Sequence, residues 1–278
     1  MIKLEKTTTY GWEEAIRGMR NPMNSWDKSD SGIFDFQEPE TWKDKIWVKE
    51  LCCDYDIYVG PNDLKLMKSL AKAGTSHSKF RRMITVYVDI TAPLYWWKEF
   101  DTYKVGTVAN SCSTMHKIAG KEFTLEDFSC EHLFDWEPDE HGEPRDTADT
   151  EEELIKQGAV FTHEEYDPYS TSGEDNGIWY EGDIAADALR NTVAILNAYR
   201  EKYLETKDKK YWWQMIQLLP SSYNQKRTVM MNYEVIAAIV EQRKGHKLDE
   251  WHDFIEWAHK LPLAKEIIFC EDGDSHDD

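Results

Sequence analysis

Residues 219–243 read LPSSYNQKRTVMMNYEVIAAIVEQR, in which a Leu-Pro pair, a short strand and a helix follow one another. The strand is predicted at 228–231, and the helix runs from Asn232, a residue type that caps helices, to Arg243. Asn232 lies twelve positions after Pro220, and Arg243 lies eleven positions after Asn232. Residues eleven apart on a helix are nearly in phase, so both side chains are expected on one face. An anion site at this helix N-terminus is one interpretation, and a capping Asn followed by a surface Arg is the other.

The composition indicates a globular chain with a substantial core. Hydrophobic residues make up 41% of the 278 residues, and twelve of them are Trp, a residue typical of cores, interfaces and ligand pockets. The formal net charge of -20 opposes generic binding to DNA or RNA. A single nucleotide held in a local basic pocket remains compatible with that charge.

The lack of a recognisable targeting signal and the pattern of cysteines favour a cytoplasmic protein. An apolar run of about 18 residues, which a membrane span requires, does not occur, and the first residues lack the apolar stretch of a signal peptide. Five Cys occur without metal-ligand spacing, as expected for a reduced chain. The adjacent Cys52 and Cys53 are interpreted as buried thiols rather than a redox pair.

Hydrophobic periodicity predicts further helices along the chain. They are expected at 11–20, 63–73, 183–203, 212–218 and 248–261, and another begins after Pro93 and carries Tyr95, Trp96, Trp97 and Phe100. In the first, Trp12, Ala15, Ile16 and Met19 share a face. Asn62 is the expected N-cap of the helix at 63–73. Alternating apolar and polar residues from Ile84 to Ile90 predict a strand.

Segments rich in acids and turn-forming residues are predicted to be solvated. The stretch 27–42 is a polar loop, whereas 137–153 and 166–177 are insertions, because neither separates two cores. The tail 269–278 is acidic and is predicted to be disordered. A single domain over 1–268 is therefore expected.

Two further blocks precede the 219–243 stretch. Residues 74–82 read GTSHSKFRR and lead directly into the strand that ends at Pro93. Residues 102–116 read TYKVGTVANSCSTMH. The three blocks resemble, in the right order, the family of flavin-dependent thymidylate synthases, whose Leu-Pro, Asn and Arg residues stand at the same intervals.

The resemblance is closer in spacing than in residue types. In 74–82 the family pattern is Gly-His-x-Ser-x-x-Glu-His, so Ser78 is kept, while Arg81 and Arg82 replace the Glu and the His. After Asn232 the family has an Arg where this chain has Glu234. The family's Arg upstream of the Leu-Pro pair is absent as well.

The signature Arg-His-Arg-x-x-Ser-x-Asn-x-x-Ser-x-Arg falls on 102–116 in two alternative alignments. Without a gap from the preceding strand, Tyr103 and Lys104 take the second and third positions, and Thr107 takes the first Ser. Aligned on the Asn, Asn110 and Ser113 are kept instead. Both alignments remain open.

The resemblance implies an α/β (α+β) fold with a mostly antiparallel sheet and long packed helices. It implies FAD as cofactor, NADPH and methylenetetrahydrofolate as co-substrates, a deoxyuridine nucleotide such as dUMP as substrate, and a homotetramer. The implied FAD contacts are Ser78, Arg81, Arg82, Tyr103, Lys104 and Asn232. The implied substrate contacts are Thr107, Asn110, Ser113 and Arg243, of which Arg243 is also the candidate catalytic residue.

Other interpretations of the chain stay open. A non-catalytic nucleotide-binding or structural protein on the same scaffold would explain the replaced arginines. His252, Glu256 and His259 share a helix face that could ligate a metal, but a solvated polar stripe is favoured, and so is a solvated loop over the run 163–167. No metal is therefore expected. The stretch 17–28 combines three cations with Trp26, which suits either a nucleotide-base platform or a capped helix end.

Overall fold

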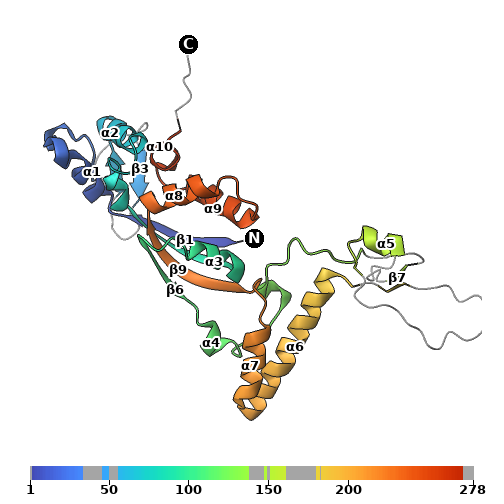
Figure 1. Ribbon diagram of the computed structural model, residues 1–278. Helices are drawn as coiled ribbons and strands as arrows, with labels where there is room; N and C mark the ends of the chain where they lie inside the picture. Colours follow the sequence, from blue (N-terminus) through green and yellow to red (C-terminus); the bar gives the residue numbers. More distant parts are fainter. Residues whose placement is uncertain are drawn as a thin grey trace, which may run out of the picture. The chain divides into compact units, whose positions relative to one another are not determined.

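The computed structural model describes residues 2–33, 46–49, 56–137, 147–148, 151–160, 180–181 and 183–271. The chain divides into two compact units, which are considered separately (Figure 1). Unit 1 consists of Met1–Cys112 and Asn224–Asp278, and unit 2 is Ser113–Tyr223. The predictions for Cys52 and Cys53, for 163–167 and 166–177 and for the end of the tail at 272–278 lie outside the described residues. The single domain over 1–268 stays a prediction.

Unit 1 is built on a four-stranded sheet in which every neighbouring pair is antiparallel. The strand order is β1 (Lys3–Tyr10), β5 (Thr85–Pro93), β9 (Asn224–Asn232) and β6 (Thr107–Ser111). β5 and β9 pair along their whole length, from Thr85 opposite Asn232 to Pro93 opposite Asn224. The predicted strands at 84–90 and 228–231 are the centres of these longer strands, and the predicted antiparallel sheet is confirmed.

Six helices belong to unit 1 among the described residues: α1 (Trp12–Arg20), α2 (Pro61–Lys72), α3 (Leu94–Phe100), α8 (Tyr233–Arg243), α9 (Asp249–His259) and α10 (Ala264–Ile267). Short 3-10 turns follow α1 at Asn21–Met23 (η1) and Trp26–Lys28 (η2), and η3 (Lys79–Arg82) precedes β5. A small sheet joins β2 (Gly32–Ile33), β4 (Asp56–Val59) and β3 (Ile46–Lys49). All the predicted helices are present in the two units, and their bounds agree with prediction to within three residues.

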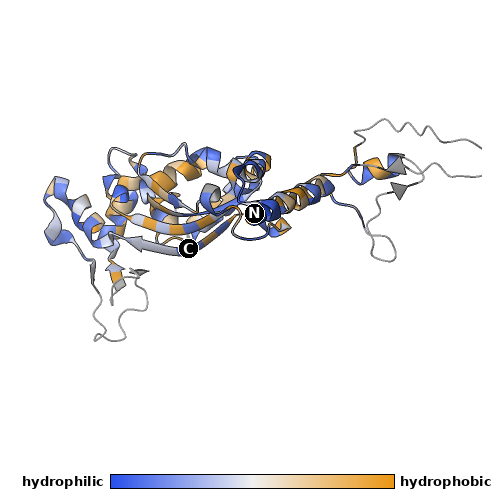
Figure 2. Cartoon of the chain, turned by 90° about the horizontal axis from the view of Figure 1, so that it is seen from below, coloured by the Kyte–Doolittle hydropathy of each residue, from blue (hydrophilic) through white to orange (hydrophobic). Residues whose placement is uncertain are grey.

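The core of unit 1 lies between the sheet and these helices, where apolar residues gather (Figure 2). The predicted face of α1 is buried, and Trp12 packs edge-on against Tyr233 at the start of α8, with ring centroids 5.3 Å apart. Trp96, Trp97 and Trp251 are also fully buried. Aromatic rings of this size dominate the apolar area that a core removes from water.

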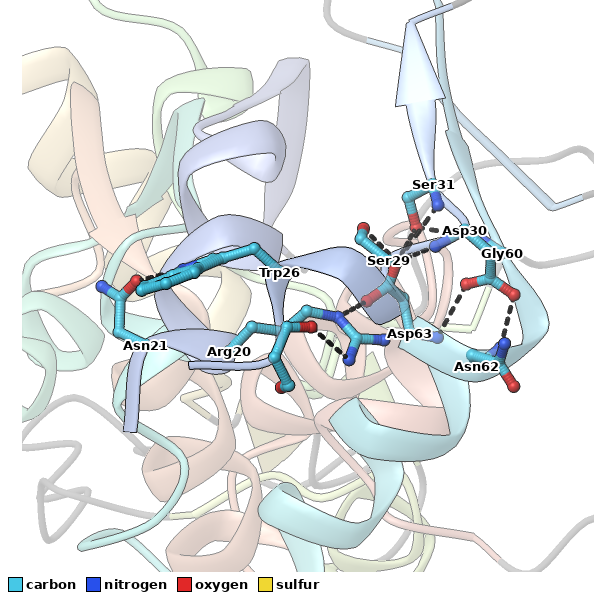
Figure 3. Close-up of polar contacts among 10 residues, drawn as sticks. Arg20, Asn21, Trp26, Ser29, Asp30, Ser31, Gly60, Asn62 and Asp63 are labelled. Atoms are coloured by element: carbon cyan, nitrogen blue, oxygen red, sulfur yellow. Dashed lines mark hydrogen bonds and ion pairs between the residues drawn. The ribbon is translucent and has the colours of Figure 1, made fainter. Parts of the chain in front are cut away.

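The start of α2 differs from prediction, because the helix begins at Pro61 and its N-cap is Gly60 rather than Asn62. The capping carboxylate comes from the preceding polar stretch: Asp30 accepts hydrogen bonds from the backbone N–H groups of Asn62 (2.8 Å) and Asp63 (3.0 Å) (Figure 3). A Cβ on Gly60 would lie 2.3 Å from the Asp30 side chain, so only glycine permits this approach. The loop predicted from residue 27 is therefore ordered at its beginning.

Asp63 is the centre of a buried polar network in unit 1 (Figure 3). One carboxylate oxygen accepts from Arg20 Nε at 2.6 Å, and the other accepts from the hydroxyls of Ser29 and Ser31, each at 2.7 Å. Burial alone would raise the pKa of Asp63, but the hydrogen bonds from Ser31, Ser29 and Arg20 outweigh it and hold the pKa below its usual value. The charged carboxylate therefore ties α1, the 29–31 segment and α2 together.

Unit 2 centres on a helical hairpin of α6 (Ala185–Thr206) and α7 (Lys209–Leu218). The helices are joined at Asp208, whose side chain accepts from the N–H of Lys210 at 2.9 Å and starts α7 earlier than predicted. The unit also contains α4 (Thr114–Lys117), η4 (Leu125–Asp127), α5 (Glu151–Lys156) and the pair β7 (Thr147–Ala148) and β8 (Tyr180–Glu181). In the described parts of both units, no helix has the length and apolarity to cross a bilayer.

Candidate functional site

The two ends of α8 meet one segment of unit 1, residues 103–107. Asn232 caps α8 as predicted, because its Oδ1 accepts from the N–H of Val235 at 3.0 Å. Its amide lies so close to Gly106, whose φ is +80°, that a Cβ there would be 3.0 Å from Nδ2. At the other end, Arg243 binds Tyr103. The helix face shared by Asn232 and Arg243, together with residues 103–107, is called here the α8 face.

Arg243 is held on three sides. Its Nε donates to the hydroxyl of Tyr103 at 2.8 Å, and its Nη1 donates to Glu99 at 2.7 Å. The guanidinium lies over the indole of Trp251, 4.5 Å from the ring centroid, which is a cation–π contact. The side chain is 16% exposed, and Nη2 donates to no atom of the described residues. The planar guanidinium is thus fixed in orientation, and Nη2 is the nitrogen without a partner among the described residues.

Glu99, at the end of α3, is the carboxylate that neutralises the charge of the Arg243 guanidinium. One of its oxygens accepts from Arg243 and from Nε1 of Trp251 (2.9 Å), and Nε2 of His246 lies 3.3 Å away. Its side chain is 34% exposed, so water reaches the carboxylate. An anionic ligand of Arg243 would compete with Glu99 for the same donors.

Five predicted site residues belong to the α8 face: Tyr103, Lys104, Thr107, Asn232 and Arg243. The Thr107 hydroxyl donates to the backbone oxygen of Tyr103 and so shapes the turn between them. Lys104 lies in the same turn, is exposed, and forms no ion pair within the described residues.

A second group of predicted residues lies around Glu234. Nine positions separate Glu234 from Arg243, which is half a turn out of phase, so the two point to opposite faces of α8. Ser78 Oγ donates to Glu234 at 3.1 Å and accepts from Arg81 Nη2 at 2.9 Å. Arg81 Nε lies 2.8 Å from the same Glu234 oxygen, and Nη1 donates to the carbonyl of Ile267 at 3.0 Å. The group borders a cavity of about 560 Å³.

The Arg81–Glu234 pair joins two departures from the thymidylate synthase pattern. Arg81 stands where that pattern has an acid, and Glu234 stands where it has a base. The side chains of Arg81 and Glu234 are only 7% and 13% exposed, so either charge alone would be destabilising, whereas the pair is balanced. The two charges therefore balance each other within this chain.

The remaining predicted residues lie elsewhere. Arg82 is exposed in η3, and Asn110 is exposed on β6 opposite Thr228. Ser113 belongs to unit 2, where its hydroxyl caps α4 by accepting from the N–H of His116 at 3.2 Å. Its oxygen also lies 2.7 Å from His116 Nδ1.

The helix face that could have ligated a metal is engaged otherwise. His252 lies 3.5 Å from Asp249, and the His259 ring stacks on Phe269 with centroids 3.5 Å apart. Within the parts of the chain that are described, no three His, Cys, Asp or Glu residues are grouped to hold a metal ion.

The sequence did not point to Glu99, His246 or Trp251. One signal was present, since Glu99 is the single acid in an aromatic helix, next to Phe100. An acid in such a helix needs a cationic partner, but periodicity alone does not say which cation reaches it.

No protein-family model matches the chain, and no curated protein matches it in sequence. Solved structures match it in fold. Thymidylate synthase X from Helicobacter pylori, solved with FAD and dUMP, is 14% identical and aligns over 98% of this chain and 100% of its own, with a TM-score of 0.55. A second structure of that flavin-dependent enzyme with FAD and dUMP, also 14% identical, aligns over 96% of this chain and 97% of its own with a TM-score of 0.52.

A third structure, the UMP/dUMP methylase PolB from Streptomyces cacaoi bound with 5-Br dUMP, is 10% identical over 97% of this chain and 94% of its own, with a TM-score of 0.49. The two Helicobacter pylori structures are enough to place the fold. This chain has the fold of the flavin-dependent thymidylate synthases, as its three sequence blocks predicted.

Proposed function

We propose that this chain binds a pyrimidine deoxynucleotide on the α8 face and acts on it as an FAD-dependent enzyme that transfers one carbon to C5 of the ring. The Helicobacter pylori protein of the same fold was solved with FAD and dUMP, which supports this ligand class. Thr107 and Arg243 are the proposed substrate contacts on this face, whereas Asn110, further along β6, and Ser113, in unit 2, stay predictions from the sequence.

The observation that carries the proposal is the fixed guanidinium of Arg243. An Arg guanidinium donates charge-assisted hydrogen bonds to a phosphate or a pyrimidine carbonyl, and Nη2 of Arg243 has no partner among the described residues. Stacking on Trp251 and the bond to Tyr103 already hold this guanidinium in one orientation, so less side-chain entropy is lost when a ligand binds.

The residues proposed for FAD fit the cofactor in part. Lys104 and Arg82 are exposed cations that would meet its phosphates. Ser78 and Arg81 are committed to Glu234, and Asn232 caps α8. FAD, when bound, would supply the hydride that reduces the transferred carbon, with NADPH and methylenetetrahydrofolate as co-substrates.

The Arg81–Glu234 pair favours a second candidate, a non-catalytic nucleotide-binding protein on the same scaffold. It places a carboxylate in the first turn of α8, where a helix would otherwise attract phosphate. A chain that keeps Arg243 but lacks the contacts that bind the FAD phosphates would bind a nucleotide without oxidising or reducing it.

A homo-oligomer, and specifically a tetramer, is part of the proposal. β6 is an edge strand whose side chains are largely exposed, and Val105 and Val108 beside and within it are 90% and 60% exposed. Exposed apolar side chains on a sheet edge favour association. Light scattering in moderate salt should give a multiple of 32.7 kDa, and a monomer at micromolar concentration would contradict this part.

The test combines a visible spectrum with titration calorimetry. The enzyme predicts a flavin absorbance band and dUMP binding that falls at least about tenfold in Arg243→Ala, since a hydrogen bond to a charged group contributes about 1.5–3 kcal/mol. Arg200→Ala in unit 2, where Arg200 donates to the Ala119 carbonyl, is the control and should bind normally. A colourless protein that does not bind added FAD but binds dUMP would support the second candidate, a non-catalytic nucleotide-binding protein. A protein that binds neither contradicts both.

A further inference from the structure

Unit 1 contains a second cavity, whose lining includes none of the proposed substrate contacts. It has a volume of about 370 Å³ and lies between α1 and the segment that follows it. Its lining includes Glu13, Ile16, Arg17, Arg20, Trp26 and Ile57. Pockets for small organic ligands commonly begin at about 300 Å³ and are mainly apolar with a few polar groups, as here.

Trp26 forms a fixed aromatic wall of this cavity. The residue is 51% exposed, although a Trp is usually mostly buried. The ring edge is held by a hydrogen bond from Nε1 to Oδ1 of Asn21 at 2.8 Å (Figure 3). The neighbouring backbone is fixed too, because Arg20 Nη1 donates to the carbonyl of Ser25 at 3.2 Å. A flat ring is therefore presented to solvent in one orientation.

The most buried lining residues of the cavity that are named here are two isoleucines and an arginine. Ile16 and Ile57 are 5% and 2% exposed, and Arg20, which is 4% exposed, is neutralised by Asp63. The hydrogen bonds that saturate Asp63 leave this pair little freedom to turn toward a ligand (Figure 3). Arg20 thus shapes the cavity without being its anion-binding group.

Arg17, at the cavity rim, is the cation that is available. Its side chain is 62% exposed, and the carboxylate that pairs with it, Glu13, is 4.0 Å away, at the outer limit of an ion pair. Such an exposed contact contributes little and is easily exchanged. A phosphate would form shorter, charge-assisted hydrogen bonds with the same guanidinium.

We propose that this cavity binds a nucleoside monophosphate, with the base stacked on Trp26 and the phosphate on Arg17. An aromatic platform beside an Arg binds bases without strong sequence preference, because every base has a π face. The site shares no residue with the α8 face, so it does not depend on the function proposed above.

The test uses titration calorimetry of the full chain with AMP and adenosine, in an Arg243→Ala background that weakens the other proposed site. AMP should bind, and Trp26→Ala should weaken it about tenfold or more, while Trp26→Phe keeps most of the affinity. Arg17→Ala should lower the affinity for AMP to that for adenosine, because adenosine has no phosphate for Arg17 to bind. Glu13→Gln should tighten AMP binding, because it removes the competing carboxylate. Lys28→Ala is the control, since Lys28 is exposed nearby but does not line the cavity.

The proposal is overturned if AMP does not bind in this background, or if Trp26→Ala and Arg17→Ala leave its affinity unchanged. It is also overturned if Lys28→Ala weakens AMP as much as Arg17→Ala does, because binding would then reflect surface charge alone. Circular dichroism of each variant shows that the fold is intact. Binding of dUMP to the unaltered Arg243 site is measured separately in a Trp26→Ala background, so failure of one site does not decide the other.

Discussion

Replacing Glu99 by Gln should tighten nucleotide binding on the α8 face. Glu99 accepts from Arg243 and Trp251, so it occupies the donors that an anionic ligand would use. Gln has the same shape and keeps an acceptor for the Trp251 indole, but it carries no charge. The variant therefore frees the Arg243 guanidinium without emptying the space beside it.

The size of the effect follows from the burial of the ion pair. Exposed pairs contribute about 0.2–1 kcal/mol, whereas breaking a fully buried pair costs about 3–5 kcal/mol. Arg243 is 16% exposed and Glu99 is 34% exposed, so this pair lies nearer the exposed limit, at about 1–2 kcal/mol. At about 1.4 kcal/mol per decade, affinity for dUMP should rise about five- to thirtyfold. The lost pair should lower the melting temperature by about 2–8 °C.

The assay is dUMP titration calorimetry of four proteins: the unaltered chain, Glu99→Gln, Arg243→Ala and the double variant. The gain from Glu99→Gln should vanish when Arg243 is absent, because the two effects act through one contact. Deoxyuridine without phosphate should show a smaller gain if the phosphate is the competing anion. An affinity that is unchanged or lower in Glu99→Gln would refute the competition between Glu99 and the ligand. A gain that persists in the double variant would refute the role of Arg243.

Three further predictions concern the scaffold. The depressed pKa of Asp63 means that its charge stabilises the fold above the unfolded pKa of about 3.9, and that this contribution is lost as the pH falls through the lower folded value. Asp63→Asn should therefore be less stable at neutral pH and show a flatter acid dependence below about pH 4 in urea unfolding. Arg81→Glu and Glu234→Arg should each destabilise by about 3–5 kcal/mol, while the double variant recovers most of the loss in denaturant midpoint. Gly106→Ala should cost about 1–3 kcal/mol, because φ is +80° and the new Cβ would crowd the start of α8; an unchanged melting temperature would contradict this.

The helices of this protein could be predicted because their signals are local. The cap at Asn232 and the apolar spacing that follows it are complete within three turns, and the structure confirms both. β1 and β6 gave no comparable signal. β1 has Lys, Glu and three Thr in succession, and β6 is exposed on nearly all positions, so alternation is weak in both. Their pairing with β5 and β9 depends on distant segments.

The candidate site could be predicted only at the level of single residues. The spacing placed Arg243 in phase with Asn232, but its partners Glu99 and Trp251 come from two other helices. The pairing of Arg81 with Glu234 joins residues far apart in the sequence. Each looked like the loss of a ligand contact when taken alone, and only the folded chain shows that the two changes balance.

The pairing of β6 with β9 makes unit 2 a hairpin loop of unusual length. Cys112 donates its N–H to the carbonyl of Lys226 at 2.9 Å. The chain therefore leaves unit 1 at the end of β6 and returns to it at the start of β9, its paired strand. The entropy of closing a loop grows only slowly with its length. The sheet of unit 1 therefore places little demand on what is inserted at this joint, whether a long helical hairpin or a tight turn. We therefore expect that the length of the insert can vary without changing the strand pairing of unit 1.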